Sequence, residues 1–315
     1  MSLIMRKNKK IFRIQHLSPV RVLLAGISIF AFMSGASLFA VSFYQLLPLQ
    51  SSFQEKITKP QAIRAPEDFF DNAQIKIDAA NNTSQLEASM TSLLSDYYGL
   101  NERVIRLCAS ADCFSKYSPE DKSADRISVT ASTSLHRQKE VATTIVQVVS
   151  SLPQGWSAQM LPETIMISQR ITYDDVLRGG LNFGPNDNQV ILLVDTNFVN
   201  YPNYTEATFQ HELFHSYKRR KLWKRDDINI TWQDIDPRVY KSLSQNNKAY
   251  SGLVIQNGYT SNYASISIEE DQAETYAFYV TKIRSGEVNL NKINDNVARE
   301  KLRYMQKVIL KDLAE

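Results

Sequence analysis

Two histidines spaced four residues apart are the strongest chemical signal in this sequence. Residues 211–215 are His-Glu-Leu-Phe-His, so Glu212 follows His211 and His215 closes the motif. Residues four apart share one face of an α-helix, which lets both imidazoles reach one metal ion. Glu212 lies beside that face, where its carboxylate can take a proton from a metal-bound water. The motif therefore predicts a catalytic zinc site, with two histidine ligands and Glu212 as the general base.

The third zinc ligand is expected to be a carboxylate. A catalytic zinc takes three protein ligands and keeps one position for water, and both remaining histidines, His16 and His136, precede the motif. Glu270 and Glu274 are four apart, so one can bind the metal while the other accepts a hydrogen bond from a ligand imidazole. Ser267 with Glu270 also fits a capping box, in which case Glu274 would be the ligand. We assign Glu270 as the ligand and keep Glu274 as the alternative.

The two parts of this site need helices to hold them. The pattern predicts a helix over residues 205–221, which Thr205 or Asn203 can cap. Four basic residues beginning at Lys218 match the negative end of its dipole. The acidic pair needs a second helix, which the pattern predicts over residues 268–284.

The remaining pattern predicts one α+β domain. Further helices are predicted near residues 86–97, 141–152 and 291–313, and short strands at residues 163–169 and 189–195. The second strand, Gln-Val-Ile-Leu-Leu-Val-Asp, is apolar enough to be buried. Gly179 and Gly180 mark a turn between the strands. We expect a small sheet flanked by helices, in a domain covering residues 75–315.

Two features outside the motif, the cysteine pair and an acidic stretch, say less about function. Cys108 and Cys113 are the only cysteines and lie in a loop-like stretch, where an oxidising compartment would let them form a disulfide. They are too few for a four-thiolate metal site. Residues 222–260 carry several aspartates, and form either a wall of the active-site cleft or a surface loop.

The N-terminus has the pattern of a membrane anchor. Basic residues crowd positions 1–21, and residues 22–47 contain no ionisable acid or base and are mostly apolar. About 20 such residues span a bilayer as a helix, and the basic side stays in the cytoplasm. We expect a cytoplasmic tail, a transmembrane helix, a linker over residues 48–74, and a periplasmic or extracellular domain. The alternative is a signal peptide cleaved after Ala36, which would export the domain equally.

The charge balance argues against nucleic acid as a partner. The net charge is only +3, from 36 Lys and Arg against 33 Asp and Glu, and part of the excess lies in the N-terminal tail. Nucleic-acid-binding domains have a stronger and more clustered positive charge. The sequence predicts no oligomeric state.

The zinc motif and the acidic helix together resemble a known family. His-Glu-x-x-His followed at a distance by Glu-Asp-x-Ala-Glu is similar to the gluzincin branch of the zincin metallopeptidases, and most closely to its anthrax-lethal-factor-like group. The resemblance covers about residues 189–284. It implies that Glu270 is the third ligand and that Tyr263, seven residues earlier, polarises the substrate carbonyl. Tyr259 and Tyr276 are nearby alternatives for that role.

The resemblance also implies a fold and a function. It implies a zincin-like domain, in which the strand at residues 189–195 lies at the edge of the cleft and pairs with an extended substrate. We therefore expect a membrane-anchored, Zn²⁺-dependent peptidase whose partners are a protein or peptide substrate and the membrane. The alternative is a non-catalytic zincin-fold module that binds a partner or acts as a scaffold outside the cytoplasm.

Overall fold

The computed structural model describes most of the chain after residue 68. The described residues are 69–97, 104–117, 126–152, 160–183, 190–195, 203–219, 226–238, 240, 250 and 252–314. All of them belong to one unit, Pro60–Glu315. The predicted basic tail, the predicted membrane helix and the cleavage site after Ala36 lie outside them. Within the described ranges, no helix combines the length and the apolar character that crossing a membrane requires.

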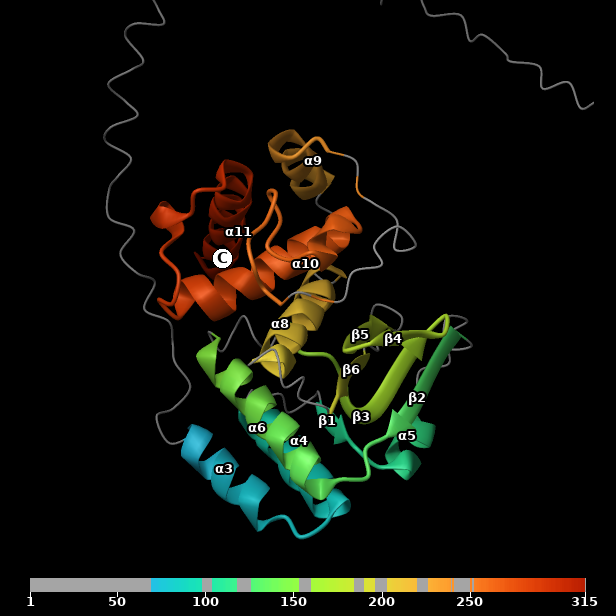
Figure 1. The fold of residues 1–315 in the computed structure, drawn as a ribbon. Helices are drawn as coiled ribbons and strands as arrows, with labels where there is room; N and C mark the ends of the chain where they lie inside the picture. Colours follow the sequence, from blue (N-terminus) through green and yellow to red (C-terminus); the bar gives the residue numbers. More distant parts are fainter. Residues whose placement is uncertain are drawn as a thin grey trace, which may run out of the picture. The chain divides into compact units, whose positions relative to one another are not determined.

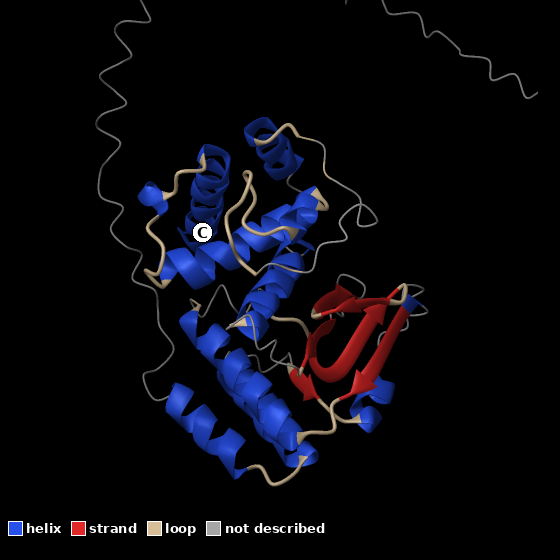
Figure 2. Ribbon diagram, in the orientation of Figure 1, coloured by secondary structure: helices blue, strands red, loops and turns tan. Residues whose placement is uncertain are grey.

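Helices make up most of this unit, and one small sheet accompanies them (Figure 2). The helices are α3 (Phe69–Ala79), α4 (Thr83–Tyr97), α5 (Ala111–Tyr117), α6 (Leu135–Ser151), α8 (Tyr204–Tyr217), α9 (Asp226–Ile235), α10 (Ile268–Phe278) and α11 (Asn296–Ala314). Short helical turns are η5 (Tyr263–Ser265), η6 (Tyr279–Arg284) and η7 (Leu290–Lys292). The strands are β1 (Arg106–Cys108), β2 (Ile127–Ala131), β3 (Thr164–Tyr173), β4 (Val176–Arg178), β5 (Gly180–Phe183) and β6 (Val190–Val194). This confirms the predicted α+β class.

The sheet is mixed and is centred on β3 and β6. Its strand order is β1-β3-β6-β5, and β2 and β4 both pair with the far end of the long strand β3. β1, β3 and β6 run parallel, whereas β5 is antiparallel to β6. The predicted strand at residues 189–195 is therefore present as β6, but the expectation that it pairs with an extended substrate is wrong, because β3 and β5 already occupy its two sides. β6 pairs on both sides, and β5 is the strand at that edge.

The apolar sequence of β6 has a clear physical reason. Successive side chains of a strand point to opposite faces of the sheet. Ile191 and Leu193 pack into the larger core with the helices, while Val190, Leu192 and Val194 pack into a smaller core that includes Phe114 of α5. Because both faces are covered, every residue of this strand is apolar and buried.

Helix α8 lies between the sheet and the C-terminal helices (Figure 1). It contacts β5 and β6 on one side, α6 at its flank, and α10 on the other side. Its burial is correspondingly broad, since 10 of its 14 residues are buried. A motif carried on α8 is thus held by packing from three directions.

Three expectations about local structure differ from the structure. Helix α3 starts at Phe69, inside the predicted linker, because Phe69, Ala73 and Ile77 form a buried face. The loop-like stretch at the cysteines is the short helix α5. Part of the stretch at residues 222–260 is the helix α9.

Candidate metal centre

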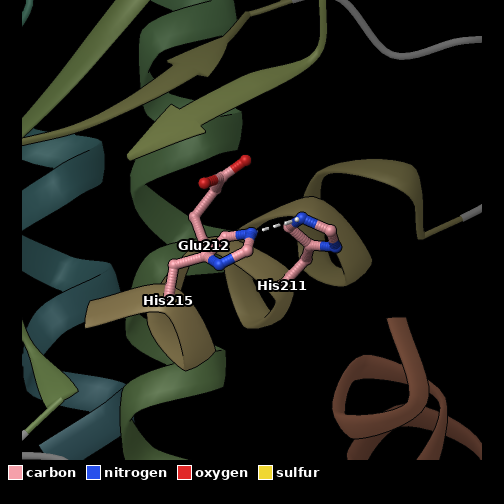
Figure 3. A group of neighbouring side chains, drawn as sticks. All are labelled: His211, Glu212 and His215. Atoms are coloured by element: carbon pink, nitrogen blue, oxygen red, sulfur yellow. Dashed lines mark hydrogen bonds between the residues drawn. The ribbon is translucent and has the colours of Figure 1, made fainter. Parts of the chain in front are cut away.

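Helix α8 presents His211 and His215 on one face. The helix begins after Asn203, which adopts a left-handed conformation with a φ of 68° and makes no side-chain capping bond. The two Nε2 atoms lie 3.0 Å apart, and Figure 3 shows both rings turned toward the same point. With Glu212 they form a group whose candidate ligand atoms all lie within 4.8 Å of one another.

Helix α10 brings Glu270 to the same point. Ser267 caps this helix, and its hydroxyl accepts a hydrogen bond from the Glu270 backbone N–H at 3.2 Å. The Glu270 carboxylate nevertheless faces the histidines, with Oε2 at 2.9 Å from His211 Nε2 and 3.6 Å from His215 Nε2. The backbone cap and the carboxylate position are thus compatible.

The spacing of these three atoms fits a zinc ion. Zinc–nitrogen and zinc–oxygen bonds are about 2.0–2.2 Å long, so tetrahedral ligand atoms are about 3.3–3.5 Å apart. The observed triangle has sides of 3.0, 2.9 and 3.6 Å. Glu270 Oε2 is buried, and its close neighbours are the Nε2 atoms of the two histidines. Two imidazoles and one carboxylate are also a donor set that zinc accepts in catalytic sites.

Glu274 occupies the other side of the His211 ring. Its Oε1 lies 2.8 Å from His211 Nδ1, while its Oε2 accepts a hydrogen bond from the Tyr250 hydroxyl at 3.2 Å. Burial lowers the pKa of His211, but the carboxylates of Glu270 and Glu274 outweigh it and raise that pKa well above its ordinary value. The structure therefore places the Glu270 carboxylate beside the Nε2 atoms of both histidines and the Glu274 carboxylate at Nδ1 of His211.

Glu212 is buried beside the ligands. Figure 3 shows its carboxylate extending from α8, and one of its oxygens lies within 4.8 Å of the candidate ligand nitrogens of both histidines. It reaches toward the start of β5, where a Cβ on Gly180 would lie 3.1 Å from Glu212 Oε1. Burial raises the pKa of Glu212, against the opposing effect of the nearby imidazoles. A carboxylate in this position can act on a water held at the three ligand atoms.

Of the three candidate tyrosines, Tyr263 is the one that faces the histidines. Its ring lies 5.9 Å from the His211 ring, and its hydroxyl accepts a hydrogen bond from Arg178 Nη1 at 3.0 Å. Burial raises the pKa of Tyr263. Tyr276 instead stacks on a phenylalanine in the core, and Tyr259 lies under the Arg238 guanidinium.

A cavity of about 250 Å³ opens beside the motif. It is lined by Val176, Leu177, Arg178, Gly179, Gly180, Tyr204, Thr208, His211, Glu212, Tyr250, Asn262, Tyr263, Ile266 and Glu274. The polar residues of this lining that sequence reasoning missed include Arg178, Tyr204 and Tyr250. Arg178 comes from a strand and Tyr250 from a loop that only the fold brings to α8, whereas Tyr204 is the first residue of α8 and was overlooked beside the motif.

The glycine pair has a role that its turn propensity did not reveal. A Cβ on Gly179 would overlap the Tyr204 side chain, and one on Gly180 would lie 2.5 Å from Thr208 Cγ2. The two glycines thus allow the start of β5 to pack directly on α8. This close contact places the edge strand beside Glu212.

A buried ion network holds α10 in place behind the site. Lys301 of α11 is fully buried, and its Nζ lies 2.6 Å from both Asp271 Oδ2 and Asp236 Oδ2. Asp271 Oδ2 also accepts hydrogen bonds from Trp232 Nε1 at 2.8 Å and the Tyr240 hydroxyl at 2.9 Å. Asp236 therefore belongs neither to a surface loop nor to the lining of the cavity.

The cysteines lie away from this centre. Cys108 of β1 and Cys113 of α5 are joined in a disulfide. Neither residue lines the cavity beside the motif.

A protein-family model matches the part of the chain that carries the site. Residues 149–311, slightly more than half of the chain, match the model of a family described as "putative zinc-binding metallo-peptidase". The matched range contains both α8 and α10. Among solved structures, the chain is similar to the "crystal structure of a putative zinc-binding metallo-peptidase" from Bacteroides caccae, at 14% identity over 73% of this chain and 86% of that chain, with a TM-score of 0.45. A search of curated proteins finds no match.

Proposed function

The chain belongs to the family described as "putative zinc-binding metallo-peptidase", and from this premise we propose that it is a zinc-dependent peptidase of the gluzincin type. His211, His215 and Glu270 would hold the zinc. The observation that carries the proposal is the triangle of 3.0, 2.9 and 3.6 Å that their three ligand atoms form. A glutamate as third ligand is also what the gluzincin resemblance implies.

The protein groups around this triangle can perform peptide hydrolysis. When bound, zinc lowers the pKa of a coordinated water toward about 7 and polarises the carbonyl of the bond to be cleaved. Glu212 accepts the proton of the attacking water and passes it to the departing amine. Tyr263 donates its hydroxyl proton in a hydrogen bond to the carbonyl oxygen as negative charge develops there.

The edge strand β5 offers a place for the substrate main chain. It pairs with β6 on one side, and no described strand pairs with its other side. An extended peptide can add to such an edge through main-chain hydrogen bonds. Because Gly180 of β5 lies against Glu212, a peptide in this position would pass close to the general base.

The decisive experiment replaces Glu212 by Gln in the full chain. We expect wild-type protein to bind about one zinc and to cleave members of a peptide library, and Glu212→Gln to keep the zinc and lose hydrolysis by a factor of about 100 or more. Glu269→Gln is the matched control, because Glu269 lies beside Glu270 but is exposed. Retained turnover in Glu212→Gln would contradict the assigned base. Zinc binding without any wild-type turnover would instead support the non-catalytic binding module.

We also propose that the N-terminal helix anchors this domain outside the cytoplasm. The uncharged stretch at residues 22–47 with its basic flank supports the anchor, and the disulfide supports an oxidising compartment. Alkaline extraction of membranes should leave the full chain in the pellet, and protease added outside the cytoplasmic membrane should digest the domain. Release of a shortened chain that starts after Ala36 would favour the cleaved signal peptide.

A further inference from the structure

We infer that Arg178 binds a carboxylate of the peptide substrate and thereby makes the enzyme selective for peptides with a negative charge next to the cleaved bond. This inference rests on the proposed peptidase function and specifies its substrate class. Arg178 is the last residue of β4 and lines the same cavity as His211 and Glu212. Nothing in the zinc-binding group or in the assigned base requires a cation at this position.

Within the described part of the chain, the guanidinium of Arg178 forms no ion pair, and Asp174 acts on it only at longer range. Among the residues that the structure describes, no carboxylate lies within ion-pair distance of it, including Glu212 and Glu274 in the same cavity. Its Nη1 donates a hydrogen bond to the Tyr263 hydroxyl at 3.0 Å, and its Nε is buried with no partner among the described residues. An arginine carries five N–H donors, so most of them are available to a ligand.

A half-buried arginine that forms no ion pair is suited to bind an anionic ligand. Leaving buried charge and N–H donors without partners costs free energy, which an incoming carboxylate would recover. The planar fork of a guanidinium also matches the two oxygens of a carboxylate in a bidentate pair. A neutral carbonyl would satisfy one donor and leave the charge unpaired. The chemistry therefore favours a carboxylate over a peptide carbonyl as the ligand.

The distances place this anion close to the reacting bond. Arg178 donates to Tyr263, and the Tyr263 ring lies 5.9 Å from the ring of His211. The cavity that contains all three has a volume of about 250 Å³, below the roughly 300–1,000 Å³ of pockets for drug-sized ligands. A carboxylate at Arg178 would therefore belong to the residue on one side of the cleaved bond, as a C-terminal carboxylate or an acidic side chain.

The sheet holds Arg178 in this position. Its backbone pairs with Ile171 of β3, and the tight turn before β4 uses Asp174 and Asp175, both with positive φ. Two residues later, Gly180 packs on α8 beside Glu212. Arg178 is thus only two residues away from the glycine that packs against the side chain of the proposed base.

The test compares matched peptides on matched variants of the full chain. One pair of probes is N-acetyl-tetraalanine with a free carboxylate and with an amide, and the other is a set of amidated alanine peptides carrying Glu or Gln at each position. Wild-type protein should prefer the charged member of at least one pair. Arg178→Gln should lower kcat/KM for that charged member roughly 10- to 100-fold more than for the neutral member, mainly through KM. Arg178→Lys should recover part of the loss.

Arg170→Gln is the control, because Arg170 lies on β3 with an exposed side chain and should have no effect. An equal loss for charged and neutral peptides would overturn the inference, since Arg178 would then act only through Tyr263. Thermal unfolding of each variant identifies any loss that comes from misfolding.

A binding experiment tests the role of Arg178 independently of whether the protein is a peptidase. Calorimetry on zinc-loaded Glu212→Gln, with and without Arg178→Gln, measures the affinity of the same peptides without turnover. Tighter binding of the charged peptide that depends on Arg178 would support the inference even if wild-type protein hydrolyses nothing. Hydrolysis without any preference for charge would overturn the inference and leave the peptidase function standing.

Discussion

Glu274 lies directly behind His211, with its Oε1 2.8 Å from the imidazole Nδ1, on the side of the ring opposite Glu270. This arrangement fixes which nitrogen of His211 is free to bind a metal, because Nδ1–H faces the carboxylate and Nε2 faces the ligand point. The Tyr250 hydroxyl donates to the second oxygen of Glu274 and so holds the carboxylate in turn. Such outer partners of zinc ligands strengthen metal binding.

Replacing Glu274 by Gln should therefore weaken zinc binding without unfolding the protein. We expect the affinity to fall roughly 10- to 100-fold, because the imidazole loses its charged acceptor. Competition with a zinc chelator measures the change. Glu269→Gln, an exposed neighbour, should show wild-type affinity. Equal zinc affinity in Glu274→Gln and wild type would mean that this carboxylate does not orient the ligand.

Removing zinc should destabilise the domain. The three ligand atoms come together only in the folded chain, so zinc binds the folded state in preference to the unfolded state. A ligand present at 100 times its Kd adds about 2.7 kcal/mol of stability, which corresponds to roughly 5–10 °C in Tm for a domain of this size. Calorimetric unfolding before and after chelation measures the shift, and added zinc should reverse it. A Tm that does not respond to zinc would argue against a bound metal at the three ligands.

Replacing Lys301 by Met should cost far more stability than a surface lysine would. Lys301 is fully buried between Asp236 and Asp271, with both contacts at 2.6 Å. Removing one partner of a buried ion network leaves uncompensated charge and costs about 3–5 kcal/mol. Denaturant unfolding gives the free energy. Lys307→Met on the same helix is the control, since Lys307 is exposed, and a comparable loss there would contradict this explanation.

The same network predicts a loss of stability in acid. Burial would raise the pKa of Asp236, but Arg238 and Lys301 outweigh it and hold the value at about 2, below the ordinary 3.8. A depressed pKa means that the unfolded chain takes up the proton first. The contribution of Asp236, about 2 kcal/mol, is thus present above pH 4 and disappears as the pH falls toward 2. Urea unfolding across this range measures the slope, which Asp236→Asn should reduce. An unchanged slope in that variant would mean that other groups control the acid response.

Replacing Gly180 by Ala should push β5 away from α8. The new Cβ would lie 2.5 Å from Thr208 Cγ2 and 3.1 Å from Glu212 Oε1. Overpacking of this kind costs about 1–3 kcal/mol and should also lower peptidase activity, because the edge strand and the base move apart. Adding Thr208→Ser removes the methyl group that blocks the Cβ and should restore part of both losses. No recovery in the double variant would show that the clash lies elsewhere.

The local sequence was sufficient to predict the features that follow from the repeat of a helix or a strand. His211 and His215 had to share a face once their segment was helical, because 3.6 residues per turn brings positions four apart together. The apolar run of β6 predicted a buried strand for a similar reason, since a strand covered on both faces has no polar side. The sequence also predicted the acidic helix, but it left Glu270 and Glu274 as alternative ligands. A capping box between Ser267 and Glu270 would have made Glu274 the ligand.

Tertiary structure decided everything that depends on contacts between distant segments. The rotation of α10 against α8 turns Glu270 toward the Nε2 atoms and leaves Glu274 at Nδ1. Pairing of β6 on both sides makes β5 the edge strand, which an apolar run alone does not specify. Arg178 reaches the cavity only because β4 folds back on β3 and the glycines that follow allow close contact with α8. The physical reason is that helix and strand periods act over a few residues, whereas the position of a carboxylate or a guanidinium relative to a metal site depends on how whole elements pack.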